Sequence, residues 1–215
     1  MTGSARVGRW GKGAAALVLV TLAVSCSNAK PASLGTQTPS GSTAPSSSAT
    51  KTEAPVAVES NPPGDIPDSQ VYVAYASAGG HFTVKVPEGW TRATAASAVS
   101  FNGKLNTIAI SWMSASSTPT VQSVQSSDVP RLRKTQRAFQ FVSIKSVSLP
   151  AGPAVLLSFR ANSAPNDVTG KQYRDELLWY ALYHNGTEVI VQLISPVGAD
   201  NVDPWNIVSK SIRWK

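Results

Sequence analysis

The stretch that decides the fold is YRDELLWYALYH (residues 173–184), Asn185-Gly186 and TEVIVQLIS (residues 187–195). Asn-Gly is the strongest two-residue signal for a β-hairpin, because both turn positions need a positive φ. We therefore predict that the two flanking segments pair as antiparallel strands. Counting back from the turn gives three wholly apolar pairs on one face: Leu182–Val189, Tyr180–Val191 and Leu178–Leu193.

The opposite face of this hairpin is mixed, but it is still largely apolar. Its pairs are Tyr183–Glu188, Ala181–Ile190 and Trp179–Gln192. Strands that are apolar on both faces belong at the centre of a sheet that carries a layer on each side. We therefore expect this hairpin to lie in the middle of a covered sheet.

Other strands are predicted N-terminal to this hairpin. FTVKV (residues 82–86) alternates apolar and polar side chains, which is typical of a half-buried strand, and Pro87 ends it. Two further hairpins are predicted from their turns: Asn102-Gly103 between residues 99–101 and 105–113, and residues 150–153 between 147–149 and 155–159.

Two helices are predicted to cover the sheet. Asp128 and Pro130 mark the start of the first, and its apolar residues Val129, Leu132 and Phe139 recur at helical spacing, with Gln136 between them. In the second, Asp203 is expected at the N-cap and Pro204 at the first helical position, followed by the apolar stripe Trp205, Val208 and Ile212. The fold class is therefore α+β: an antiparallel sheet of about six or seven strands with helices packed on it.

Three features together resemble a known family. They are the opening FTVKVPEGW (residues 82–90), the central hairpin, and a last helix that ends in Ser211-Ile212-Arg213-Trp214. The segment 70–215 resembles the PsbP-like fold, and more closely the PsbP-like lipoproteins of actinobacteria, the LpqN kind. The resemblance implies a binding or assembly factor. Photosystem members are linked to metal retention, but no metal ligands match here, so we carry over no metal and no cofactor.

The N-terminus predicts export. Arg6, Arg9 and Lys12 precede the apolar run 14–24, which at ~1.5 Å per residue is too short to span a bilayer and suits a signal peptide. The run ends in LAVSC (residues 22–26), which resembles the bacterial lipobox. That resemblance implies cleavage after residue 25 and acylation of the Cys26 thiol. The alternative is an ordinary secretory signal with an incidental cysteine.

Residues 27–68 contain no aromatic residue, and 29 of these 42 residues are Ser, Thr, Pro, Gly or Ala. Such a segment buries too little apolar surface to offset the entropy of ordering it. We therefore expect residues 26–69 to be a lipidated cysteine and a flexible tether, with glycosylation as an open alternative. Residues 70–215 form the folded domain.

Composition excludes several classes of function. The chain has 19 Lys and Arg against 12 Asp and Glu, but signal cleavage leaves 16 basic residues and a net charge of +4. Its basicity is therefore no argument for nucleic-acid binding. The single cysteine allows no intrachain disulfide and no thiolate zinc site. Sequence motifs for nucleophile-elbow hydrolases, zincins and phosphate-binding loops are absent.

The titratable residues do not form a pattern that predicts a catalytic site. His81 and His184 are expected at surface turns. The adjacent Asp175 and Glu176 are expected to point to opposite faces of one strand, most simply in contact with solvent or paired with neighbours of Arg174. Asp65 and Asp68 lie in a loop and carry no metal prediction. The five tryptophans of the domain are expected mainly in core packing: Trp90, Trp112, Trp179, Trp205 and Trp214.

The densest charge cluster is Arg131, Arg133, Lys134 and Arg137, which we expect on one helix. The simplest interpretation is a solvated helix face. The alternative is contact with anionic lipid headgroups or wall polymers.

The sequence thus predicts a monomeric, non-catalytic binding or assembly module, anchored by Cys26 to the outer face of the plasma membrane. Its expected partner is an envelope protein or wall polymer. Two other hypotheses stay open: a carrier of an apolar or lipid ligand in an internal cavity, and an envelope enzyme with an unrecognised site.

Overall fold

The computed structural model describes residues 53–79 and 81–215, and these belong to one compact unit. The predicted signal segment and Cys26 lie outside the described residues. The elements, in chain order, are β1 (Tyr72–Ala76), β2 (Phe82–Pro87), β3 (Thr91–Ala95), β4 (Ala98–Gly103), β5 (Asn106–Ser114), α1 (Val121–Ser123), the π-helical turn η1 (Val124–Asp128), α2 (Val129–Thr135), β6 (Gln140–Leu149), β7 (Gly152–Asn162), β8 (Arg174–His184), β9 (Thr187–Pro196), α3 (Val202–Lys210) and β10 (Arg213–Trp214).

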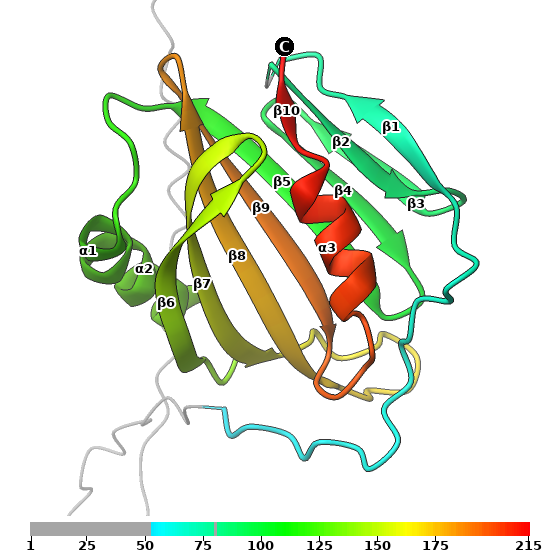
Figure 1. Cartoon of the computed structure of the whole chain (residues 1–215). Coiled ribbons are helices and arrows are strands. Elements are labelled where there is room, and N and C mark those ends of the chain that lie inside the picture. The colour runs from blue at the N-terminus through cyan, green and yellow to red at the C-terminus, as the bar shows by residue number, and fades with distance from the viewer. Residues whose placement is uncertain (1–52, 80) are drawn as a thin grey trace, which may run out of the picture. The chain divides into compact units, whose positions relative to one another are not determined.

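In the described part of the chain the strands form two antiparallel sheets (Figure 1). The main sheet has seven strands in the order β3-β4-β5-β9-β8-β7-β6, and the small sheet has the order β1-β2-β10. The α+β class and the size of the main sheet are as predicted. The strand predicted from FTVKV exists as β2, but it lies in the small sheet and not in the main one.

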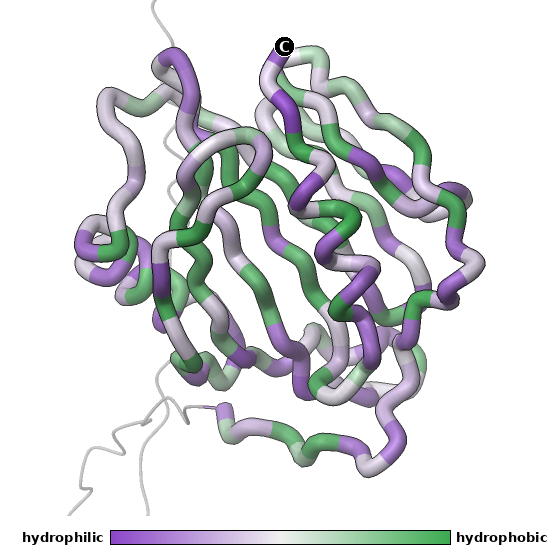
Figure 2. The backbone as a smooth tube through the Cα atoms, viewed as in Figure 1, coloured by the Kyte–Doolittle hydropathy of each residue, from purple (hydrophilic) through white to green (hydrophobic). Residues whose placement is uncertain are grey.

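The β8–β9 hairpin confirms the register counted from the sequence. Leu182 pairs with Val189 and Trp179 with Gln192, as expected. Asn185 and Gly186 both have positive φ, 44° and 79°, which is why this dipeptide closes the turn. The hairpin lies at the centre of the main sheet, and Figure 2 shows hydrophobic residues along its two strands.

One face of the main sheet is covered by α3 and the small sheet (Figure 1). Trp205, Val208 and Ile212 are buried there as predicted, but α3 ends at Lys210, so Ile212 follows the helix and Arg213–Trp214 form β10 instead of the predicted helix end. They share a core with Phe82 of β2 and with the apolar face of the central hairpin. α3 begins after Asn201 and not after Asp203, because the backbone N–H of Trp205 already bonds the Asn201 carbonyl.

The other face carries the helical segment α1-η1-α2. Val124, Val129 and Leu132 are buried against side chains that include Trp179. The segment begins earlier than predicted, after Thr120, whose side chain accepts a hydrogen bond from the Ser123 N–H. Pro130, which has no N–H to bond within a helix, is accommodated directly after the wider π-helical turn.

The two remaining turn predictions have different outcomes. Residues 150–153 do form a hairpin, in which Leu149 pairs with Gly152. Asn102-Gly103 does not form the predicted turn, because Gly103 still pairs with Asn106 and the chain reverses two residues later, at Lys104-Leu105. Gly103 is needed there for space: a Cβ atom would lie 2.3 Å from Cε2 of Trp90.

Residues 53–68, here called the strap, differ from the expected tether. Ile66 is only 5% exposed and belongs to the core, and its N–H donates to Oδ1 of Asn201 at 2.8 Å. Buried asparagine side chains satisfy the strap's backbone groups at several points. In the described residues the packed unit therefore begins at Glu53 rather than at residue 70. No helix of this part is long and apolar enough to cross a membrane.

Candidate functional site

The candidate site is an open cleft of about 430 Å³ at one end of the main sheet. Three elements enclose it: the turn between β4 and β5, the loop 163–173 between β7 and β8, and the residue that follows α2. Its lining residues are Asn102, Lys104, Leu105, Thr107, Gln136, Ala161, Asn162, Ser163, Ala164, Asn166, Lys171, Tyr173, Asp175, Leu177 and Ile194. The cleft therefore combines an apolar floor with a polar rim.

Asp175 is the unusual residue of this cleft. It pairs with Ala161 across β7 and with Pro196 across β9, and alternation along β8 puts its side chain on the same face as Leu177 and Trp179. Asp175 is only 9% exposed. Burial raises the pKa of its carboxyl from 3.8 to about 7, although the neighbouring Arg174 lowers it.

The Asp175 carboxylate has no hydrogen-bond or ion-pair partner among the described residues. Arg174 directly precedes it in β8, but the Arg174 guanidinium is engaged with other acceptors. Its guanidinium donates to the Ala138 carbonyl at 2.8 Å, to Oδ1 of Asn162 at 3.1 Å and to Oε1 of Gln140 at 3.0 Å. The sequence predicted solvent contact for Asp175 or pairing with neighbours of Arg174, and the solvent contact is wrong because Asp175 is only 9% exposed where the loop 163–173 and the β4–β5 turn line the cleft with it.

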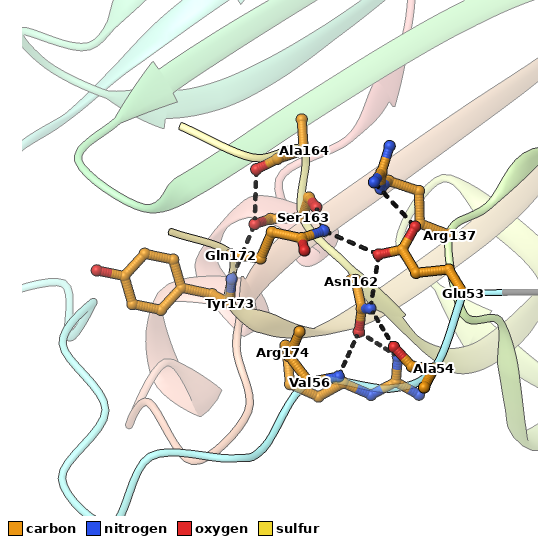
Figure 3. A network of polar contacts seen from close by, with 10 residues as sticks. All are labelled: Glu53, Ala54, Val56, Arg137, Asn162, Ser163, Ala164, Gln172, Tyr173 and Arg174. Atoms are coloured by element: carbon orange, nitrogen blue, oxygen red, sulfur yellow. Dashed lines mark hydrogen bonds and ion pairs between the residues drawn. The ribbon is translucent and has the colours of Figure 1, made fainter. Parts of the chain in front are cut away.

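Asn162 joins the cleft to the strap (Figure 3). Its Nδ2 donates to Oε1 of Glu53 at 2.9 Å and to the Ala54 carbonyl at 2.8 Å, while its Oδ1 accepts from the Val56 N–H at 3.0 Å. Gln172 also donates to Glu53, at 2.9 Å. These hydrogen bonds, followed by the nearby Arg137 charge, lower the pKa of Glu53.

The loop 163–173 is held in place from within and from the strap. Oδ1 of Asn166 accepts from the N–H groups of Val168 and Thr169, which closes a local turn. Lys171 bonds Glu59 at 2.6 Å and lies 4.7 Å from the centroid of the Tyr173 ring. The hydrogen bond to Glu59 is the first cause of the raised pKa of Lys171. The wall of the cleft therefore depends on strap contacts.

The structure separates the residues that an enzyme hypothesis would bring together. Glu176 lines a different cleft on the opposite face, as alternation predicted. His184 stacks on the Trp214 ring at 5.1 Å, and lies nine residues along β8 from Asp175, roughly 30 Å at strand spacing. His81 lies before β2 with a positive φ of 55°.

Of the two acidic loop residues, Asp65 holds the strap in place. Oδ1 of Asp65 accepts from the N–H of Asp200 at 2.8 Å. Among residues 53–79 and 81–215, no group of three His, Cys, Asp or Glu side chains gathers in a way that suits a metal ion.

The basic cluster is only partly helical. Arg131, Arg133 and Lys134 lie on α2, whereas Arg137 lies beyond its end, because the backbone turns extended at Gln136. Arg131 pairs with Asp128 at 2.5 Å and Arg137 pairs with Glu53 at 2.9 Å. Arg133 lies 5.9 Å from the Phe139 ring centroid. The Arg137–Glu53 pair places this cluster beside the start of the strap.

The tryptophans mostly serve packing. Trp179 and Trp205 are buried, and Trp90, Trp112 and Trp214 pack against the core while remaining partly exposed. A second cleft, of about 330 Å³, lies over β3, β4 and β5 and is lined largely by Ala, Ser and Thr. It is open to solvent, so it is not the internal apolar cavity that the carrier hypothesis requires.

Comparison with known proteins identifies the fold. No family model and no curated protein matches this chain. The solution structure of cyanobacterial PsbP from Synechocystis sp. PCC 6803 is similar with a TM-score of 0.51 at 13% identity, over 71% of this chain and 98% of that one. The crystal structure of the Saccharomyces cerevisiae Ran-binding protein Mog1p has a TM-score of 0.46 at 9% identity, over 68% and 96%. The first likeness shows a PsbP-like fold.

Proposed function

We propose that this chain is a lipid-anchored binding module at the outer face of the plasma membrane, of the actinobacterial PsbP-like lipoprotein kind. The observation that carries the proposal is the position of Cys26, the only cysteine, at the end of an apolar run of signal-peptide length. Two or three acyl chains on one residue bind a membrane durably, whereas one chain binds only marginally.

A binding role is supported by the cleft beside Asp175. A buried carboxyl group without a partner costs folding free energy, and such costs are common where a site is shaped for a ligand. Asp175 is remote from His184, and Glu176 opens onto another face, so among the described residues that line this cleft there is no histidine and no second carboxyl group for acid–base work. We therefore propose binding without catalysis.

The basic cluster supports a second contact with the membrane. Arg133 and Lys134 are exposed and have no ion pair among the described residues. Arg137, three residues after Lys134, pairs with Glu53, so the start of the strap lies at the end of this cluster. A tether that starts there would present the α2 side to anionic headgroups.

The anchor is tested by producing the full chain and its Cys26→Ser variant in an actinobacterial host. We expect the wild-type protein in the membrane fraction, with a mass that corresponds to a chain starting at Cys26 and carrying acyl groups. The variant should lose the acyl mass and leave the membrane fraction or remain as uncleaved precursor. Ser27→Ala is the matched control and should behave as wild type.

The same cells test the binding role. Cross-linking in intact envelopes should give adducts to the wild-type chain that decrease when Cys26→Ser removes the anchor. A wild-type chain that starts downstream of residue 26, or an unmodified Cys26, would overturn the anchor. Absence of adducts above background would leave the protein without a binding role.

A further inference from the structure

The cleft beside Asp175 contains a charge that the protein itself does not balance. Asp175 is nine-tenths buried, lines the cleft and has no hydrogen-bond or ion-pair partner among the described residues. An unpaired carboxylate in such surroundings is costly, and a positive group placed against it would remove most of that cost. The cleft is therefore suited to a ligand that brings a cation.

The neighbouring cations cannot take this role. Arg174 donates to three other acceptors, as described above, and Lys171 is paired with Glu59. Lys104 is exposed on the turn between β4 and β5, at the rim of the cleft. Each is therefore either engaged elsewhere or placed where water solvates it.

The side chains around Asp175 indicate the chemistry of the uncharged part of the ligand. Leu177 is buried beside it, and Ile194 and Leu105 complete an apolar lining. Such a surface favours alkyl groups, at about 0.8 kcal/mol per buried methylene. A small, strongly hydrated cation such as a metal ion would gain nothing from this floor, and three carboxylate or histidine ligands are absent from the described residues around it.

We infer that this cleft binds a small organic cation, an alkylammonium group whose nitrogen contacts the Asp175 carboxylate and whose carbon chain lies on Leu177 and Ile194. The inference deepens the proposed binding role and names its ligand class. The occupied cleft would then have a complete ion pair at its floor.

The pH dependence follows from the charges around Asp175. Burial raises the pKa of this carboxyl to about 7, so its ionised fraction rises about ten-fold between pH 6 and pH 8. The other charged or titratable groups near Asp175 are Arg174 on the same strand, Arg160 on β7, Lys171 and Tyr173 on the loop 163–173, and Lys104 on the β4–β5 turn. Lysine and arginine stay protonated over this range, so affinity for an ammonium ion should increase with pH.

The test uses the full mature chain in non-ionic detergent micelles, whether or not Cys26 carries acyl groups, with n-butylammonium as the probe. Butyrate and n-butanol of the same length serve as anionic and neutral probes. Chemical-shift titration should give saturable changes at Leu177 and Ile194 with n-butylammonium, with about ten-fold higher affinity at pH 8 than at pH 6. Asp175→Asn should weaken binding at pH 8 at least ten-fold. Glu176→Gln, which removes the adjacent carboxylate on the opposite face, should bind as wild type.

Three results would overturn the inference. They are the absence of saturable shifts at these residues, affinity that is flat or falls between pH 6 and pH 8, and tighter binding of butyrate or butanol than of n-butylammonium. The pH comparison uses only the wild-type chain, so it holds even if a variant fails to fold. Failure here would leave Cys26 acylation unaffected, and the loss of acylation would leave the cleft titration unaffected, so the two proposals are separately testable.

Discussion

At the scale of single residues, Asp175 shows how a buried charge connects stability to function. Its carboxyl is enclosed by a loop and a turn, and only the charge of Arg174 partly offsets the cost of burial. Proteins retain such groups when another role outweighs the lost free energy. The same carboxyl that would bind a cation should therefore weaken the fold when the cleft is empty.

We predict that Asp175→Asn stabilises the protein above pH 7. The folded-state pKa of about 7 lies above the ordinary 3.8, so the folded chain holds this proton more tightly than the unfolded chain does. The wild-type protein therefore loses stability as pH rises from about 4 to 7. The variant should gain about 4 kcal/mol at pH 8 and almost nothing at pH 4.

Urea denaturation at pH 4 and pH 8 measures this difference, with Glu176→Gln as the control for removing an adjacent carboxylate. An Asp175→Asn gain that is the same at both pH values would show that ionisation is not the cause. A loss of stability at pH 8 would show that the carboxylate has an unrecognised partner.

At the scale of elements, local patterns determined some segments and misplaced others. The β8–β9 register follows from one dipeptide turn and from residues within a few positions of it. The end of α2 was misplaced because Phe139 continues the apolar spacing, although the backbone at Gln136 is already extended. Phe139 instead packs on Phe159 of β7, at a centroid distance of 5.1 Å.

We predict that α2 contributes to binding of anionic membranes. In the chain 27–215, which lacks the signal segment and Cys26, the double variant Arg133→Gln/Lys134→Gln should bind phosphatidylglycerol-containing vesicles roughly 30-fold less tightly. Each charge near such a surface contributes about 1 kcal/mol. Vesicle co-sedimentation at low salt measures the affinity.

The matched control is Lys85→Gln/Lys210→Gln, which removes two exposed cations from β2 and from the end of α3. Equal losses in the two double variants would indicate an effect of net charge alone. If the α2 double variant binds the vesicles as tightly as the wild-type chain, the cluster is only a solvated helix face.

At the scale of the whole molecule, the strap connects distant parts of the domain. Glu53 contacts a residue 109 positions away, and Ile66 contacts one 135 positions away. Glu53 also reaches Arg137, so the strap holds the loop 163–173, the end of β7 and the segment after α2 together. Removal of the strap should therefore destabilise several segments that lie far apart in the sequence.

We predict that the fragment 70–215 is less stable than the fragment 53–215 by at least about 3 kcal/mol. Loss of Ile66 exposes core surface, at about 2 kcal/mol for such a side chain, and Asn162, Asn201 and Asn106 lose partners, at about 1–3 kcal/mol for each unsatisfied buried group. Thermal unfolding of the two fragments measures this difference.

Ile66→Ala in the fragment 53–215 separates the apolar part of the effect from the polar part. It should account for about half of the loss. Equal unfolding temperatures for 53–215 and 70–215 would show that the strap contacts contribute nothing to stability.

The sequence by itself determined the α+β class, the central hairpin with its register, and the apolar stripe from Trp205 to Ile212. These depend on turn chemistry and on periods of two and 3.6 residues, which short segments carry within themselves. It also yielded the prediction of acylation at Cys26, which rests on neighbouring residues alone.

Only the tertiary structure decided that the strap packs on the domain, that Asn102-Gly103 continues a strand, and that Asp175 is buried. Each depends on contacts between segments far apart in the chain: Trp90 over Gly103, Asn162 with Glu53, and two separate loops closing over Asp175. The free energy of such contacts comes from burying a group between several segments at once. The residue pattern of a single segment therefore does not predict them.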